Sequence, residues 1–178
     1  MKNPGSSFDW RAASVGAGAL LAGASLVQSF PALRLELFAR SAAELISLFT
    51  GAPISRSELG WMIPLSGAPV VVTIACSATD FFLLVATLLG FQVARRGFHP
   101  LVATGLAVAA ALPVAIFVNA MRIITVAYAH PWLISRLPPK YEAILHMATG
   151  AAIFLPALIL LNLVLETYGN RHAPSTRV

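Results

Sequence analysis

Three residues in this chain carry side chains suited to acyl transfer. Cys76 stands just before an apolar segment, so its thiol would meet a helix N-terminus, where the helix dipole favours the thiolate. His146 lies in the first turn of a later apolar segment, and an imidazole can remove or return a proton near neutral pH. Arg122 lies within another such segment, and its fixed charge can stabilise a thiolate or the oxyanion of a tetrahedral intermediate. Together they predict attack on a peptide carbonyl through a thioester.

Each of these side chains also has a structural interpretation. A lone cysteine in an apolar sequence is usually a small buried hydrophobe, an arginine within a span can snorkel to the interface, and His146 can cap a helix. Asp80 is either part of the site or an acidic residue that the helix dipole favours in a first turn. Asn119 lies three residues before Arg122 on the same helix face, where it either orients the guanidinium or bonds another helix.

The amino-acid composition places the chain in a membrane. It has 178 residues, of which 58% are hydrophobic and 11% charged, whereas soluble domains carry about 25% charged residues. Four apolar segments can cross about 30 Å of hydrocarbon as helices: residues 12–31, 78–94, 101–128 and 143–166. We therefore predict an all-α polytopic membrane protein with about four transmembrane helices.

Charge and residue types exclude several other classes of site. The net charge is +5, but the basic residues are scattered and flank apolar segments, as at membrane interfaces, so we predict a lipid bilayer and no nucleic acid as partner. The sequence shows no metal-ligand cluster and no phosphate-binding glycine loop, and we expect no metal and no cofactor. The single cysteine excludes an internal disulfide.

The segments between the spans have distinct patterns. Residues 33–50 predict an interfacial amphipathic helix, because Glu36, Arg40, Glu44 and Ser47 share one stripe. Residues 51–74 contain several glycines and prolines and predict a short extracytoplasmic loop or hairpin, with a short strand at 70–72. Residues 130–140, with three prolines, predict a loop.

Two of the predicted spans present a face of small residues. Such faces let membrane helices approach closely. The first span carries Gly16, Ala19 and Gly23, and the third carries Ala103, Ala107 and Ala111.

The distribution of basic residues predicts the orientation. The short turn at residues 95–100 contains Arg95 and Arg96 and is placed in the cytoplasm. Both termini then lie inside, and the first span is too long for a typical cleavable signal, so it is expected to remain as a helix. Cys76, Arg122 and His146 all approach the extracytoplasmic side, in a cleft between the second, third and fourth spans.

The order of these motifs resembles the exosortase/archaeosortase family. Residues 74–78 read Ile-Ala-Cys-Ser-Ala, residues 119–123 read Asn-Ala-Met-Arg-Ile, and His146 follows at the start of the last span. The resemblance covers a core of about 31–165 within a single transmembrane catalytic domain, 1–178. Residues 76–82 also resemble the compact subgroup called exosortase K.

The resemblance implies a function and a role for each residue. Family members are proposed to process a C-terminal sorting signal of exported proteins, made of a short motif, a transmembrane helix and a basic cluster. Cys76 would be the nucleophile, Arg122 the stabiliser and His146 the acid/base, with Ser77, Asp80 and Asn119 in support. The protein would be a multi-pass protein of the inner (cytoplasmic) membrane. One departure is Ala78, where the family usually has glycine, a residue with easier access to positive φ.

Two other functions remain open at the level of the residues. A non-enzymatic membrane assembly subunit would use Arg122 to pair with an acidic residue of a partner. A small transporter would use Arg122 to bind an anion, and internal repeats would favour it, but the sequence shows none. Replacing Cys76 discriminates between these classes, because a scaffold would tolerate the change.

Overall fold

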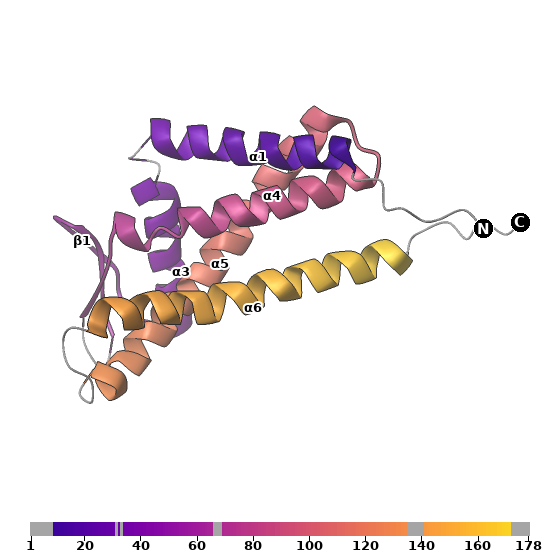
Figure 1. The fold of residues 1–178 in the computed structure, drawn as a ribbon. Helices are drawn as coiled ribbons and strands as arrows, with labels where there is room; N and C mark the ends of the chain where they lie inside the picture. The colour runs from indigo at the N-terminus through magenta and orange to yellow at the C-terminus, as the bar shows by residue number, and fades with distance from the viewer. Residues whose placement is uncertain (1–8, 31, 33, 66–68, 135–140, 172–178) are drawn as a thin grey trace, which may run out of the picture.

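The computed structural model describes residues 9–30, 32, 34–65, 69–134 and 141–171. Long helices dominate the fold, and a small sheet closes one end (Figure 1). In chain order the elements are α1 (Trp10–Ser29), the π-helix η1 (Arg34–Arg40), α3 (Ser41–Thr50), β1 (Ser55–Ser57), β2 (Gly60–Pro64), β3 (Pro69–Val72), the 3₁₀ turn η2 (Ile74–Cys76), α4 (Thr79–Arg95), α5 (Pro100–Ile134) and α6 (Glu142–Arg171).

Four helical segments are long and apolar enough to cross a membrane: Trp10–Ser29, Ile74–Arg95, Pro100–Ala129 and Met147–Thr167. The predicted fold class, an all-α polytopic membrane protein, is therefore confirmed. The start of α1, the end of α6 and the turn between α4 and α5 lie at one end of the bundle, and the sheet lies at the other (Figure 1).

The predicted small faces are where the spanning helices meet. A Cβ at Gly16 would lie 3.3 Å from the carbonyl oxygen of Thr87, and one at Gly90 would lie 3.2 Å from the Cβ of Ala19. Glycine on both α1 and α4 thus lets the two backbones pack directly, which maximises van der Waals contact between membrane helices. The small face of α5 is buried as well, at Ala103, Ala107, Ala111 and Ala115.

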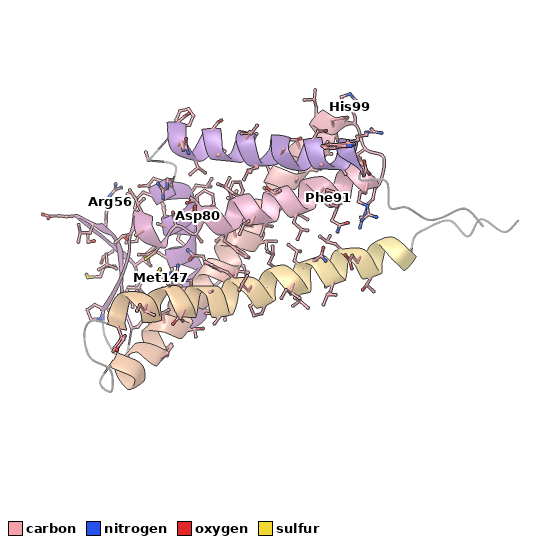
Figure 2. The ribbon with its side chains drawn as sticks, in the orientation of Figure 1. Arg56, Asp80, Phe91, His99 and Met147 are labelled. Atoms are coloured by element: carbon pink, nitrogen blue, oxygen red, sulfur yellow. The ribbon has the colours of Figure 1, made fainter. Side chains whose placement is uncertain are left out.

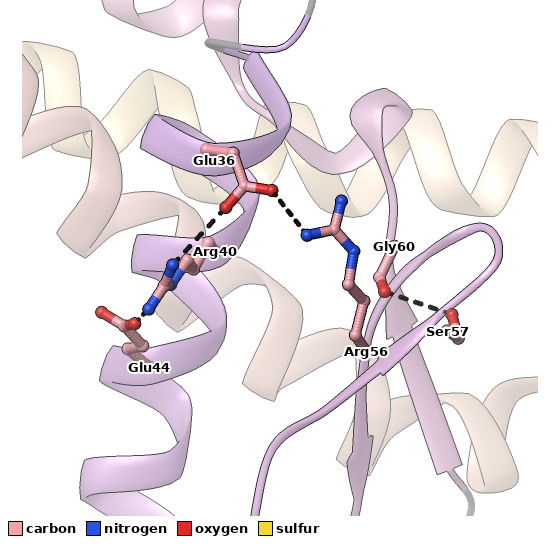
Figure 3. Close-up of polar contacts among 6 residues, drawn as sticks. All are labelled: Glu36, Arg40, Glu44, Arg56, Ser57 and Gly60. Carbon is pink, nitrogen blue, oxygen red and sulfur yellow. Dashed lines mark hydrogen bonds and ion pairs between the residues drawn. The ribbon is translucent and has the colours of Figure 1, made fainter.

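The segment before the sheet forms a helix that lies across the end of the spanning helices (Figure 1). Its charged stripe is confirmed, since Arg40 Nη1 lies 3.6 Å from a carboxylate oxygen of Glu36 and Arg40 Nε lies 2.7 Å from one of Glu44. The Glu44 and Glu36 carboxylates raise the pKa of the Arg40 guanidinium. Arg56 of β1 reaches the same Glu36 at 3.2 Å (Figure 3), so this stripe also fastens the helix to the sheet.

The loop predicted at residues 51–74 is a three-stranded antiparallel sheet in the order β1-β2-β3. Trp61 pairs with Val72 in its register, and the guanidinium carbons of Arg40 and Arg56 lie 5.3 and 5.4 Å from the centre of the Trp61 ring. Gly60 has φ +156, and a Cβ there would clash with the Val72 carbonyl oxygen. A side chain at position 60 would therefore push β3 away, and β3 leads into Cys76.

One predicted boundary is wrong. The loop expected at residues 130–140 begins later, because α5 continues through Pro131 to Ile134, and residues 135–140 lie outside the described part of the chain. Proline is a poor marker of helix ends in a membrane protein, since neighbouring groups can satisfy the backbone carbonyl that it frees.

Candidate active site

Cys76 lies in a tight turn between the sheet and α4. Strand β3 ends at Val72, and two backbone bonds close the turn: Cys76 N–H donates to the Thr73 carbonyl at 3.0 Å and Ser77 N–H to the Ile74 carbonyl at 3.1 Å. The Thr73 hydroxyl lies 3.9 Å from the Cys76 sulfur. The cysteine is half-buried and packs against the apolar cluster that contains Trp61, Ile63 and Val72.

Ala78 closes this turn in a conformation that alanine disfavours. Its φ and ψ are 49 and 31, and it is the only non-glycine residue with positive φ in the described part of the chain. The left-handed region costs an L-residue about 1–2 kcal/mol. The Ala78 carbonyl accepts the first helical bond of α4, from Phe82 N–H at 3.0 Å, so this strained residue sets the direction in which α4 leaves the turn.

Asn119 of α5 binds the turn from the bundle interior. Its side-chain Nδ2 donates to the carbonyl oxygen of Cys76 at 2.5 Å, and the residue is 1% exposed. Its Oδ1 has no hydrogen-bond partner among the described residues. The amide thus joins the two segments that carry Cys76 and Arg122. Of the two roles that the sequence left open for Asn119, this is closer to a bond with another segment than to orienting the Arg122 guanidinium.

A cavity of about 450 Å³ lies beside this turn, between the start of α4 and the first half of α6. Ser77 and Asp80 line it, whereas Cys76 is not among its described lining residues. In Figure 2, Asp80 and Met147 both lie at the sheet end of the bundle, and His99 lies at the other. The full described lining is Arg34, Ala75, Ser77, Ala78, Thr79, Asp80, Phe81, Leu84, Arg122, Met147, Gly150, Ala151 and Phe154.

Arg122 enters this cavity from α5 and is held against α6. It is 8% exposed, and its guanidinium carbon lies 5.3 Å from the centre of the Phe154 ring. A Cβ at Gly150 would lie 3.2 Å from the Arg122 Nε, so the glycine leaves room for the guanidinium. Phe154 in turn stacks on Phe81 of α4 at 4.5 Å. An arginine buried at such a position is typical of a functional cavity in a membrane protein.

A second arginine, which the sequence analysis did not select, lines the same cavity. Arg34 of η1 donates through Nη2 to the Thr79 hydroxyl at 3.5 Å, and the Ser77 hydroxyl lies 3.5 Å from the same oxygen. Arg34 stands four residues before Phe38, which is 2% exposed. The sequence could have indicated Arg34, because it lies one helical turn before a buried aromatic residue and therefore on the same helix face. Its presence gives the cavity a second positive charge beside Arg122.

Comparison with known protein families found a match over most of the chain. The family model described as transmembrane exosortase (Exosortase_EpsH) matches residues 10–163. The chain belongs to the transmembrane exosortase family. Searches of the curated proteins and of the solved structures found no match.

His146 belongs to helix α6 of this exosortase, and its side chain lies outside the described part of the structure. Its backbone position can still be related to the cavity. Met147, Gly150, Ala151 and Phe154 line the cavity, at the spacing of one helix face. His146 is four residues before Gly150, so its position continues this face by one turn.

The conformation of Ala78 generates a prediction for this exosortase. Ala78→Gly should raise the free energy of unfolding in detergent by about 1 kcal/mol, because glycine adopts positive φ without the Cβ clash. Ala78→Val should lower it, because a β-branched residue suits this region least. Denaturant or thermal unfolding of matched preparations measures both changes. Equal stability of all three proteins would show that residue 78 is not left-handed.

Proposed function

We propose that this exosortase is a membrane-embedded cysteine peptidase or transpeptidase that processes C-terminal sorting signals of exported proteins through a thioester at Cys76. One observation carries the proposal. Segments far apart in the sequence meet at one cavity: Ser77 and Ala78 beside the nucleophile, Arg122 of α5, and Gly150 one turn after His146. Residues 1–178 would act as one catalytic domain, with the core at about 31–165.

In the first step the Cys76 thiolate attacks the scissile carbonyl carbon and forms a carbon–sulfur bond. The negative charge moves to the carbonyl oxygen, which the Arg122 guanidinium stabilises by directed hydrogen bonds. The tetrahedral intermediate collapses, the carbon–nitrogen bond breaks, and the amine of the departing C-terminal segment takes a proton from the His146 imidazolium. The product is a thioester on Cys76 and a neutral imidazole at His146.

In the second step an amine or a water molecule attacks the thioester. The neutral His146 removes the proton of the attacking group, a second oxyanion forms beside Arg122, and the thiolate of Cys76 leaves. An amine acceptor gives a new amide, whereas water gives a carboxylate. In both cases Cys76 and His146 return to their starting protonation states.

The substrate would be the C-terminal transmembrane sorting helix of a partner protein, entering from the lipid. The span of α6 supports this route, because only 6% of it is buried within the protein. Leu155 and Ile159 of α6 are 58% and 60% exposed, while Phe154 on the adjoining face lines the cavity. A helix in lipid could therefore lie along α6 and bring its preceding residues to the cavity.

The site would face the extracytoplasmic side of the inner (cytoplasmic) membrane. The turn that follows α4, with Arg95 and Arg96, lies at the end of the bundle opposite the sheet, as do the start of α1 and the end of α6 (Figure 1). Short basic turns favour the cytoplasm. An exported substrate then reaches the site after translocation.

The nucleophile is tested by replacing Cys76, the only thiol in the chain. Cys76→Ala and Cys76→Ser should abolish the size shift of co-expressed exported reporters that end in a short motif, a transmembrane helix and a basic cluster. The variants should reach normal membrane levels, because the half-buried thiol is a minor part of the packing. Unchanged processing by Cys76→Ala would end the peptidase proposal and favour an assembly subunit.

The role of Arg122 is tested by changing its shape at constant charge. Arg122→Lys should reduce turnover nearly as much as Arg122→Ala, by about 10²- to 10³-fold, because lysine lacks the planar fork that can bond an oxyanion twice and stack on Phe154. Arg95→Lys, in the basic turn at the far end, is the matched control and should leave turnover unchanged. Near-normal turnover of Arg122→Lys would refute directed hydrogen bonding.

The orientation is tested in a Cys76→Ser protein that carries one new thiol. A membrane-impermeant maleimide added to intact cells should label Leu59→Cys, since Leu59 in the β1–β2 turn is 75% exposed. The same reagent should label His99→Cys, in the exposed turn before α5, only after the membrane is permeabilised. The reverse pattern would place the cavity on the cytoplasmic side and separate it from exported substrates.

A further inference from the structure

The turn that carries Cys76 is held by the two backbone hydrogen bonds of a 3₁₀ turn and by one side chain from α5. Strand pairing ends at Val72, and helix α4 begins at Thr79. Within this interval the Cys76 carbonyl oxygen accepts from Asn119 Nδ2 at 2.5 Å. Ala78, two residues later, is in the left-handed region. The bond from Asn119 therefore acts directly beside the most strained backbone position described.

The Asn119 amide stabilises the fold less than an amide whose two polar atoms are both bonded. Asn119 is 1% exposed, and its Oδ1 has no hydrogen-bond partner among the described residues. A buried acceptor without a partner is destabilising, so part of the stability that the amide gains by bonding the Cys76 carbonyl is lost at its own Oδ1. Overall stability alone does not account for an asparagine at this position, whereas the geometry of the Cys76 turn does.

We propose that Asn119 is a positioning residue for Cys76. By holding the Cys76 carbonyl, it keeps Ala78 in its left-handed conformation and keeps the thiol at the entrance to α4. The proposal rests on the proposed function only in that Cys76 is the reacting group. It assigns Asn119 an action on the nucleophile turn, through the backbone, and not on the guanidinium of Arg122.

The other side-chain contacts next to the turn support this assignment. The Ser77 and Thr79 hydroxyls lie 3.5 Å apart, and Arg34 reaches Thr79 at 3.5 Å. These contacts are at the long limit of hydrogen bonding, so among the described side chains the Asn119 amide is the main restraint on the turn, beside the two backbone bonds. Without it, the strain at Ala78 would shift the turn toward other conformations by about 5- to 30-fold.

The experiment is a double-mutant cycle between Asn119 and Ala78. Asn119→Leu removes the donor at similar volume, with Asn119→Ala as a second variant, and Ala78→Gly makes the left-handed conformation inexpensive without the clamp. Thr125→Val is the matched control, because Thr125 is exposed on the same helix and donates to the Met121 carbonyl of that helix at 2.8 Å. Three quantities are measured: reporter turnover, the free energy of unfolding, and the ¹⁹F NMR signal of a trifluoroethylthio group on Cys76, the single thiol.

Asn119→Leu should lower turnover by about 5- to 30-fold through kcat, with KM nearly unchanged, and should lower the free energy of unfolding because the Cys76 carbonyl loses its donor. The fluorine signal should shift or split. Adding Ala78→Gly should recover most of the turnover and restore the single wild-type line, while Thr125→Val should change neither.

Two results would overturn the positioning role. One is a loss of turnover in Asn119→Leu that is the same with and without the Ala78→Gly substitution. The other is an unchanged fluorine line in Asn119→Leu. Failure of this role is distinct from failure of the proposed function. If Cys76→Ala still processes reporters, the peptidase proposal fails, but the fluorine signal still reports whether Asn119 holds the turn.

Discussion

The structure depends on one constraint: a backbone that leaves regular secondary structure inside an apolar assembly must have its polar groups satisfied by other means. Water does not do this within hydrocarbon, and each unsatisfied group is costly. Strand pairing ends at Val72 and helix α4 begins at Thr79, so the backbone between them belongs to neither the sheet nor a long helix. The bond from Asn119 to the Cys76 carbonyl satisfies one group of this interval. It also ties the first motif of the site to the helix that carries Arg122.

Close packing of small residues supplies the rigid frame around this turn. Glycine at positions 16 and 90 lets α1 and α4 meet backbone to backbone, and a row of buried alanines does the same for α5. Helix α6 is different, since little of its span is buried. Its described links to α4 include the stack of Phe81 on Phe154 at 4.5 Å and, near the opposite end, the bond from Gln92 to Asn162 at 3.1 Å. The cavity lies where α4 and α5 meet this helix, which has much free apolar surface.

The sheet and its charged neighbours complete the frame on the other side. Glu36 bridges Arg40 of its own helix and Arg56 of β1 (Figure 3), and both arginines also contact the Trp61 ring. The exposed ion pairs contribute little free energy individually. Together they hold η1 against the sheet. With η1 in this place, Arg34 reaches Thr79, close to the turn that carries Cys76.

Much of this arrangement was predictable from local sequence properties. The four spans, the small faces of α1 and α5, the Glu36–Arg40–Glu44 stripe and the strand at residues 70–72 follow from hydropathy, helix periodicity and residue type. The order of the cysteine, arginine and histidine motifs was enough to predict the family. Each of these features depends on residues that are close together in the chain.

Only the tertiary structure decided how the site is assembled. The partner of Asn119 lies 43 residues away, the place of Arg34 in the cavity depends on how η1 meets α4, and the side chain of Cys76 packs toward the sheet cluster instead of lining the cavity. The left-handed conformation of Ala78 was indicated only by the family glycine that it replaces and not by the residue itself. Alanine has no preference for that region, so the torsion depends on how the strand before it and the helix after it are placed.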